Sequence, residues 1–298
     1  MENALLTEAE SVISSIDIPS QPQVILDIYN EVLKKEPDFK KINELVSMDM
    51  AMSARIIKIS NSTFFGLSQK VHSIERALMV LGLENFTNII ITSSMRDLLK
   101  VSQMSHEEYE TFFEHCMHVA RINQYITHKV RIFSGGVIFP SQTYMAGLFH
   151  DCGIMMLRQK YPDYLSKVDA SISQGKTLIE AEEENFQTNH CLVGYVVSRS
   201  WKLPDIVCKV IQHHHDVDMS FNEDKTMKTM GLINILTECV ISYLHKSENH
   251  FTEIYGHLLN SAEEFKPILE SLYFNSDDFR DIVDTTKELI FQESDVQL

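Results

Sequence analysis

Apolar residues recur at helical spacing along nearly the whole chain, and the alternation of apolar and polar residues that marks strands is scarce. Positions three, four and seven apart share one face of a helix, and this rule places Val24, Ile25, Ile28 and Val32 together. Only 10 glycines and 7 prolines interrupt such segments. The pattern predicts an all-α protein with little or no sheet.

The same rule predicts where the helices begin and end. Five short helices are expected before residue 100, with a break at Gly82, and a longer helix follows at about 107–130. Gly135-Gly136 and Pro140 predict a loop, after which one helix should carry residues 146–157 and end at Tyr161-Pro162. Further helices are expected from His190 to Trp201, after Pro204, and around 232–240.

These segments suggest three regions. We predict an N-terminal helical bundle at residues 1–101, a helical core at 102–245 and a C-terminal helical extension at 246–298. A length of 298 residues allows one large domain or two smaller ones.

Composition restricts the partners and the location. The net charge of −16, from 26 basic and 42 acidic residues, disfavours nonspecific binding to nucleic acid or to anionic lipid. The five cysteines form no CxxC pair, so we interpret them as free, reduced and structural, as in a cytoplasmic protein. No N-terminal signal is visible, and the most apolar window, around residues 88–92, is too short to span a bilayer.

The most informative chemistry is the pair His150-Asp151, which interrupts an apolar run from Ala146 to Leu157. A charged group is costly to bury unless it is paired, hydrogen-bonded or bound to a metal. The small residues Ala146 and Gly147 would let a neighbouring helix come close. The pair therefore indicates either two ligands for one cation or a buried hydrogen-bonded couple.

Other histidines share this inward phase. His115, His190 and His214 each lie three or four residues from apolar positions of their own helix, and His215 follows directly. Helices could thus bring five imidazoles and one carboxylate to a common centre. Two interpretations stay open: core histidines satisfied by backbone carbonyls or by one another, and ligands of a metal ion.

Some polar and sulfur-containing residues near the N-terminus have structural interpretations. Asp49 and Asn61-Ser62 are interpreted as helix caps and a fixed turn rather than as ligand contacts. Met50, Met52 and Met79 are interpreted as core filler rather than as a partner groove.

Several motifs follow one another along about residues 15–245. They are Ile18-Pro19 with Pro22, residues 49–66, residues 73–83, His115-Cys116, residues 147–153, Glu182 with His190 and Gly194, residues 201–204, and His214-His215. Taken in this order, they resemble the HDOD family, a relative of the HD phosphohydrolases, and the resemblance is specific because so many pieces occur in the family order.

The resemblance implies a fold, a role and a site. It implies an all-α fold in which an N-terminal helical bundle packs on an HD-like helical core. It implies a bacterial regulatory role in signal transduction, with partners in phosphorelay or cyclic-dinucleotide systems. By residue-wise correspondence, His115 and the doublet His150-Asp151 match the HD-type metal ligands, while His190 and His214-His215 match positions that bind a second metal in HD-GYP enzymes.

Two departures from the catalytic relatives weigh on function. Those relatives carry an Asp on a late helix, whereas here only Glu238 offers a carboxylate there, one methylene longer. No Gly-Tyr-Pro motif follows, Ile154 stands where many carry a lysine, and only Arg158 and Lys160 are basic near the doublet. A non-catalytic adapter acting through protein contacts is the first hypothesis, and a metal-dependent phosphohydrolase using Fe, Mn, Ni or Zn is the alternative.

Overall fold

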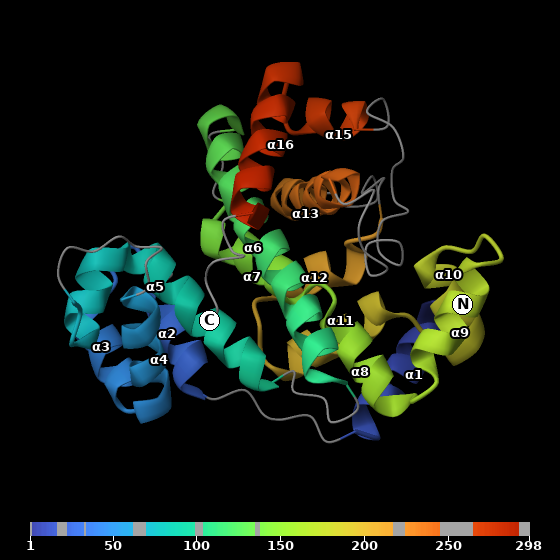
Figure 1. Ribbon diagram of the computed structural model, residues 1–298, viewed down its shortest axis with the longest axis horizontal. Helices are drawn as coiled ribbons and strands as arrows, with labels where there is room; N and C mark the ends of the chain where they lie inside the picture. The colour runs from blue at the N-terminus through green and yellow to red at the C-terminus, as the bar shows by residue number, and fades with distance from the viewer. Residues whose placement is uncertain are drawn as a thin grey trace. The chain divides into compact units, whose positions relative to one another are not determined.

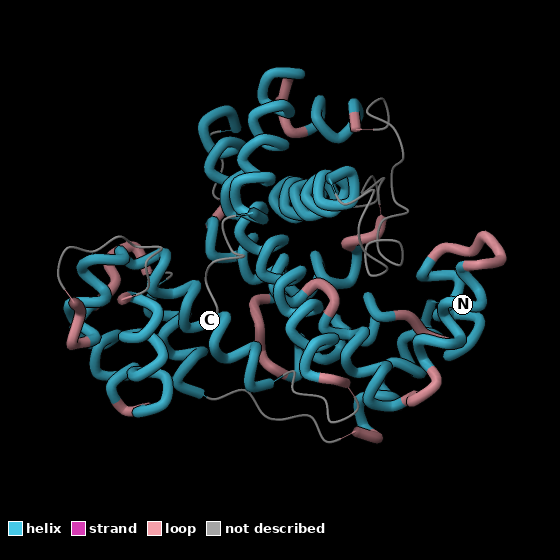
Figure 2. The backbone as a smooth tube through the Cα atoms, in the orientation of Figure 1, coloured by secondary structure: helices cyan, strands magenta, loops and turns pink. Residues whose placement is uncertain are grey.

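The computed structural model describes residues 2–16, 23–32, 34–61, 70–98, 104–134, 138–216, 224–244 and 265–291. Within these ranges the regular elements are all helices, joined by turns and loops (Figure 2). The all-α prediction is confirmed. Four features of the sequence lie outside the described residues: Pro19 with Pro22, the segment 62–66, Gly135-Gly136 and the boundary between residues 101 and 102.

The chain divides into two compact units. Unit 1 contains Met1–Ile18 and Leu99–Leu289, and unit 2 contains Pro19–Leu98 with Ile290–Leu298. The first helix, α1 (Glu2–Ser14), was not expected from the sequence and belongs to unit 1. It packs on α11 and α8 through Ala9 and Val12, which are fully buried.

Unit 2 is a bundle of α2 (Gln23–Val32), α3 (Phe39–Ser47), α4 (Met50–Ser60) and α5 (Ile74–Leu98), drawn in blue to teal in Figure 1. Asp49 caps α4 by accepting a hydrogen bond from the Met52 backbone N–H at 2.9 Å. The Asn61 side chain both donates to and accepts from the Val71 backbone, each at 2.7 Å. The structural interpretation of Asp49 and Asn61 is confirmed.

Among the described helices, α5 alone is long and apolar enough to cross a membrane, over Ile74–Arg96 with a mean hydropathy of 1.2. Its backbone leaves helical geometry at Gly82, where φ is 74° and ψ is 162°, as the sequence predicts. More than half of the window, 56%, is buried inside the protein. A broken and largely buried helix is typical of a protein core.

The interpretation of the methionines as core filler is only partly correct. Met52 is 6% exposed, but Met50 is 85% exposed and Met79 63% exposed. Both lie on helix faces turned away from the apolar core of unit 2, so a methionine in a helical pattern does not by itself indicate burial.

Unit 1 contains the remaining helices, and its long helices pack side by side. The helix α6 lies against α7 and α13, and α11 lies against α8 and α12 (Figure 1). The bounds are α6 (His106–Ser134), α7 (Pro140–Phe149), α8 (Cys152–Lys160), α9 (Tyr164–Ile172), α10 (Leu178–Phe186), α11 (His190–Ser200), α12 (Asp205–His213), α13 (Lys225–Leu244), α15 (Lys266–Ser271) and α16 (Ser276–Phe291).

Two glycines permit close contact between helices in unit 1. A Cβ atom at Gly147 would lie 2.6 Å from Asn123 Nδ2 and 2.9 Å from the Ala120 Cα on α6. A Cβ atom at Gly153 would lie 2.0 Å from the His190 backbone oxygen on α11. The close approach expected at Gly147 is therefore present, and Gly153 likewise allows α8 to approach the backbone of α11.

The C-terminal part of the chain also joins unit 1. The expected extension at 246–298 is described only over α15 and α16, since residues 246–264 and 292–298 lie outside the described ranges. Asp281 of α16 accepts a hydrogen bond from Tyr125 Oη at 2.6 Å and lies 2.5 Å from Lys129 Nζ, both on α6. These contacts fasten α16 to the helix that carries His115.

Candidate metal centre

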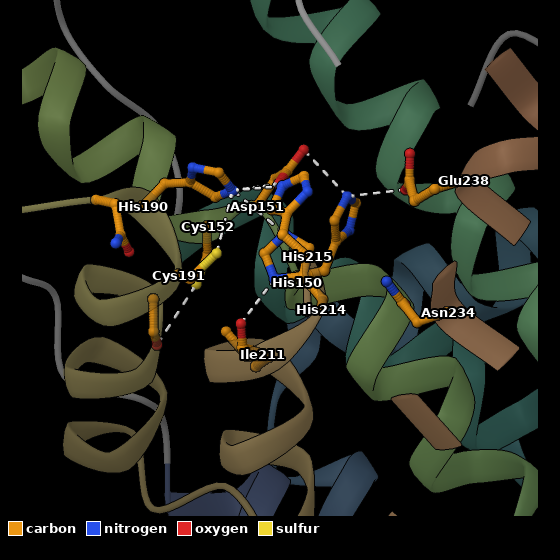
Figure 3. Close-up of polar contacts among 12 residues, drawn as sticks. His150, Asp151, Cys152, His190, Cys191, Ile211, His214, His215, Asn234 and Glu238 are labelled. Carbon is orange, nitrogen blue, oxygen red and sulfur yellow. Dashed lines mark hydrogen bonds and ion pairs between the residues drawn. The ribbon is translucent and has the colours of Figure 1, made fainter. Parts of the chain in front are cut away.

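Five parts of unit 1 bring the predicted site residues together. They are α6 with His115, the junction of α7 and α8 with His150 and Asp151, the first residue of α11 with His190, the end of α12 with His214 and His215, and α13 with Glu238. In Figure 3, Asp151 lies between His190 on one side and Glu238 on the other. All seven predicted residues lie in one cluster.

The sequence predicted that the doublet lies within one helix, but the structure shows otherwise. The helix α7 ends at Phe149 and α8 begins at Cys152, so His150 and Asp151 occupy the break between them. The Asp151 backbone carbonyl accepts from the Ile154 N–H at 2.9 Å, while its side chain makes no capping bond. The carboxylate is thereby left to face the histidines.

Three imidazoles are oriented through their Nδ1 atoms. Nδ1 lies 2.7 Å from the Gly147 carbonyl in His150 and 2.7 Å from the Ile211 carbonyl in His214. In His190 it lies 2.6 Å from the Glu182 carboxylate. Because these oxygens can only accept, each Nδ1 carries the proton, and in a neutral ring Nε2 presents its lone pair. The oxygen partners therefore select the tautomer that a metal ligand needs.

The Nε2 atoms converge. His190 Nε2 lies 3.2 Å from His214 Nε2 and 3.0 Å from His215 Nε2. Lone pairs at such distances repel one another unless a proton or a cation lies between them. The arrangement thus fits an ion at their common centre.

The Asp151 carboxylate presents one oxygen to each half of the cluster. Oδ2 lies 3.0 Å from His150 Nε2 and 3.8 Å from His115 Nε2. Oδ1 lies 3.3 Å from His214 Nε2 and 3.6 Å from His190 Nε2. Asp151 is 1% exposed, so this carboxylate is held away from water.

The late-helix carboxylate is Glu238, despite its additional methylene. Its Oε1 lies 3.0 Å from His150 Nε2 and 3.5 Å from His115 Nε2. One turn earlier, Asn234 accepts a hydrogen bond from Asn123 Nδ2 at 2.8 Å and so belongs to the packing of α6 on α13. The longer side chain therefore reaches the cluster from α13.

The ligand atoms form two sets, and a third group of His150, Asp151 and His214 connects them. We call His115, His150 and Glu238 the first set, and His190, Cys191, His214 and His215 the second set. Within each set the ligand atoms lie within 4.8 Å of one another. The residues fit a metal centre, because imidazole and carboxylate ligands suit Zn, Fe, Mn or Ni.

Two residues of the site were not predicted to act in it. Glu182 had appeared only as part of a motif, yet it is fully buried and accepts from the Tyr164 hydroxyl and from both the backbone N–H and the ring of His190. Cys191 had been interpreted as structural, like the other cysteines. All five cysteines are free and buried, as expected, but only Cys191 belongs to a possible ligand group among the described residues.

The electrostatics of the cluster favour positive charge at its centre. Burial lowers the pKa of His150, but Asp151 and Glu238 outweigh this effect and raise it well above the usual range. Burial raises the pKa of Asp151, yet the neighbouring histidines hold it well below the usual range. For His215, burial and the adjacent rings of His214 and His190 lower the pKa well below its ordinary value.

Comparison with known proteins agrees with this architecture. The HDOD domain matches residues 18–217. The crystal structure of an HDOD domain protein of unknown function from Geobacter sulfurreducens is 25% identical, with a TM-score of 0.76, covering 99% of this chain and 98% of that one.

Two more distant structures share the fold. A proposed signal transduction protein from Marinobacter aquaeolei VT8 is 15% identical, with a TM-score of 0.76 over 98% of this chain and 66% of that one. A proposed phosphohydrolase from Shewanella amazonensis SB2B is 17% identical, with a TM-score of 0.68 over 96% and 94% of the two chains.

Curated relatives are longer proteins. An uncharacterized protein of Treponema pallidum (strain Nichols) is 23% identical over 229 residues, which are 74% of this chain and 42% of that protein. The uncharacterized protein YuxH of Bacillus subtilis (strain 168) is 32% identical over 97 residues, 33% of this chain and 24% of that one. The matched parts thus span less than half the length of each relative.

Proposed function

Because this chain belongs to the HDOD family, we propose that it is a bacterial cytoplasmic signal-transduction module that holds a metal ion and acts through contacts with other proteins. One observation carries the metal-binding part of the proposal. Three Nδ1 atoms are fixed by oxygen acceptors, so that the Nε2 atoms of His150, His190 and His214 face a common centre with Asp151.

The metal would act first as a structural cross-link. Bound at the two ligand sets, it would join residues from α6, the junction of α7 and α8, α11, the end of α12, and α13, five parts of unit 1 that are distant in sequence. An ion that binds only the folded state stabilises that state in proportion to the logarithm of its concentration over the Kd. Metal binding would therefore stiffen unit 1, and the affinity of a partner that binds unit 1 would depend on whether the metal is present.

Two features argue against turnover. His150 and Asp151 are 1% exposed, and His190 and His214 are fully buried, so a phosphodiester would reach the centre only after the helices separate. On α8, the guanidinium of Arg158 is bound to Glu108 at 2.8 Å rather than directed at the cluster. A phosphate site would instead place cationic groups beside the metal.

The partners we propose are signalling proteins of two-component or cyclic-dinucleotide systems. The similarity to a proposed signal transduction protein supports this role through the shared fold. The net charge of −16 argues against nucleic acid or an anionic membrane as the target. Protein surfaces with basic patches are the complement that such a charge favours.

A metal-dependent phosphohydrolase is the second candidate, and one arrangement favours it. Asp151 offers one oxygen to each ligand set, and such a carboxylate can bridge two ions. A bound metal would supply Lewis-acid chemistry and lower the pKa of a coordinated water. The chain itself would hold and orient the ions through Asp151, Glu238 and the histidines.

The test measures metal content and hydrolysis on the same preparations. Elemental analysis of the purified chain is compared with Asp151→Asn and with His213→Gln, a control beside His214 whose ring instead contacts Asp216 at 2.7 Å. We expect metal in the wild type and in His213→Gln, a loss in Asp151→Asn, and no hydrolysis of a chromogenic phosphodiester above free metal. Wild-type protein that takes up no metal overturns the proposal, and hydrolysis abolished by Asp151→Asn establishes the phosphohydrolase instead.

A further inference from the structure

Cys191 has a position that the other cysteines lack. It follows His190 in the first turn of α11 and is 5% exposed. Its Sγ lies 3.5 Å from His190 Nε2, the nitrogen that faces His214 and His215. A single cysteine would carry no argument, but this sulfur belongs to a group of four ligand atoms that lie within 4.8 Å of one another.

The distances in the second set agree with a tetrahedral ion. Metal bonds of about 2.0–2.1 Å to nitrogen and about 2.3 Å to sulfur imply N···N edges of about 3.3 Å and N···S edges of about 3.5 Å. The Nε2 atom of His190 lies 3.2 Å from that of His214 and 3.0 Å from that of His215. The Cys191 Sγ atom lies 3.5 Å from the same His190 Nε2 atom. The three distances that meet at His190 Nε2 are thus those expected between ligands of one tetrahedral ion, and all four ligand atoms lie within 4.8 Å of one another.

The local backbone supports a thiolate at this point. Asn189 caps α11 by accepting from the Leu192 N–H at 3.0 Å, which fixes the first turn of the helix. A cysteine in the first turn benefits from the positive end of the helix dipole. The close approach at Gly153, whose Cβ atom would meet the His190 carbonyl at 2.0 Å, further restricts where Cys191 can lie.

We propose that Cys191 is a thiolate ligand and that the second set is a His3Cys metal site. This inference rests on the proposed metal binding and specifies the metal class of that half of the cluster. Thiolate and imidazole ligands select Zn²⁺ or Fe²⁺ over Mn²⁺ and Mg²⁺. The first set, with only imidazole and carboxylate ligands, lacks this selectivity, so the two halves differ in the ions that they prefer.

The competing explanation is a neutral thiol that donates a weak hydrogen bond to His190. The two differ in whether sulfur is bonded to the metal. Cobalt(II) reports this difference because a thiolate–cobalt bond produces a near-ultraviolet charge-transfer band, whereas imidazole and carboxylate ligands alone give only the visible d–d bands.

The experiment titrates the full chain with Co²⁺ and compares two variants. Cys191→Ser removes the proposed ligand, and Cys208→Ser is the matched control, a buried thiol on α12 that donates to the Leu203 carbonyl at 3.5 Å. We expect the charge-transfer band in the wild type and in Cys208→Ser, and its loss in Cys191→Ser. Zn²⁺ affinity in Cys191→Ser should fall by at least about tenfold, while Mn²⁺ affinity changes less.

A second measurement does not depend on whether the variant folds. X-ray absorption at the zinc edge of the wild-type chain should show a sulfur atom at about 2.3 Å. Bound Co²⁺ without a charge-transfer band, or zinc with only nitrogen and oxygen neighbours, overturns the role of Cys191 and leaves the metal centre intact. A chain that binds neither ion overturns the metal centre as well, so the two failures are distinguishable.

Discussion

Glu182 and His190 are joined twice by the same oxygen. Glu182 Oε2 accepts from the His190 backbone N–H at 2.9 Å and lies 2.6 Å from its Nδ1. Its other oxygen accepts from the Tyr164 hydroxyl at 2.5 Å. One fully buried carboxylate thus fixes both the start of α11 and the direction in which His190 presents Nε2.

We predict that Glu182→Gln weakens Zn²⁺ binding by roughly 10- to 100-fold, because a neutral amide orients and polarises the imidazole less well. Competition with a chromophoric chelator measures the affinity. The control is Tyr164→Phe, which removes the hydroxyl contact and leaves the bond to His190, and we expect a smaller loss. Unchanged affinity in a folded Glu182→Gln protein would show that this carboxylate has only a structural role.

The contact between α8 and α11 gives a prediction about stability. In Gly153→Ala the new methyl group would overlap the His190 carbonyl, a backbone atom that cannot move without shifting α11. We expect the free energy of unfolding to fall by about 3 kcal/mol, at the upper end for overpacking. Gly194→Ala is the milder counterpart, since its Cβ atom would meet the movable Ile211 side chain at 3.0 Å. Urea unfolding of both variants measures the difference, and equal midpoints would contradict the prediction.

Unit 2 contains a carboxylate whose charge state should affect stability. Glu31 lies 2.8 Å from Lys34 Nζ and 2.9 Å from Lys41 Nζ, and these bonds lower its pKa from 4.5 to about 2. A lowered pKa in the folded state means that the contribution of Glu31 is present above pH 4.5 and is lost as the pH falls toward 2.

We therefore predict that Glu31→Gln is less stable than the wild type at pH 6. The difference between their free energies of unfolding should narrow as the pH is lowered to 3. The neutral amide cannot form the ion pairs at either pH, whereas the wild-type contribution shrinks below pH 4.5 because the unfolded chain takes up a proton that the folded chain, with a Glu31 pKa of about 2, resists. Urea midpoints at the two pH values measure the gap. Lys40→Gln, which removes a long exposed ion pair to Glu44 at 4.0 Å, should show no comparable gap. A constant difference for Glu31→Gln across the range would contradict the assigned ion pairs.

Helical phase pointed to His115, His190 and His214, because each lies three or four residues from apolar positions of its own segment, whereas Glu238 was expected only from the family resemblance. The break between Phe149 and Cys152 was not predictable, since the residues on both sides are equally apolar. The place of Cys191 among the possible ligands was not predictable either, because a buried thiol follows the same sequence pattern as any small apolar residue. Only the distances between side chains of different helices distinguish a possible ligand from a residue that merely packs in the core.

The last prediction concerns Glu238, the carboxylate that α13 brings to the cluster. Glu238 Oε1 lies 3.0 Å from His150 Nε2, so the backbone of α13 is placed for the longer side chain. In Glu238→Asp the carboxylate would withdraw by about 1.5 Å, the length of one carbon–carbon bond. We expect the first set to bind metal at least about tenfold more weakly, with no gain in phosphodiester hydrolysis.

The control is Glu238→Gln, which keeps the length of the side chain and removes its charge. Comparing the two variants shows whether the length or the charge of Glu238 determines the metal affinity. Elemental analysis and the chromogenic assay measure both properties. Tighter binding in Glu238→Asp would mean that α13 can approach the cluster, and new hydrolysis would favour the phosphohydrolase over the adapter.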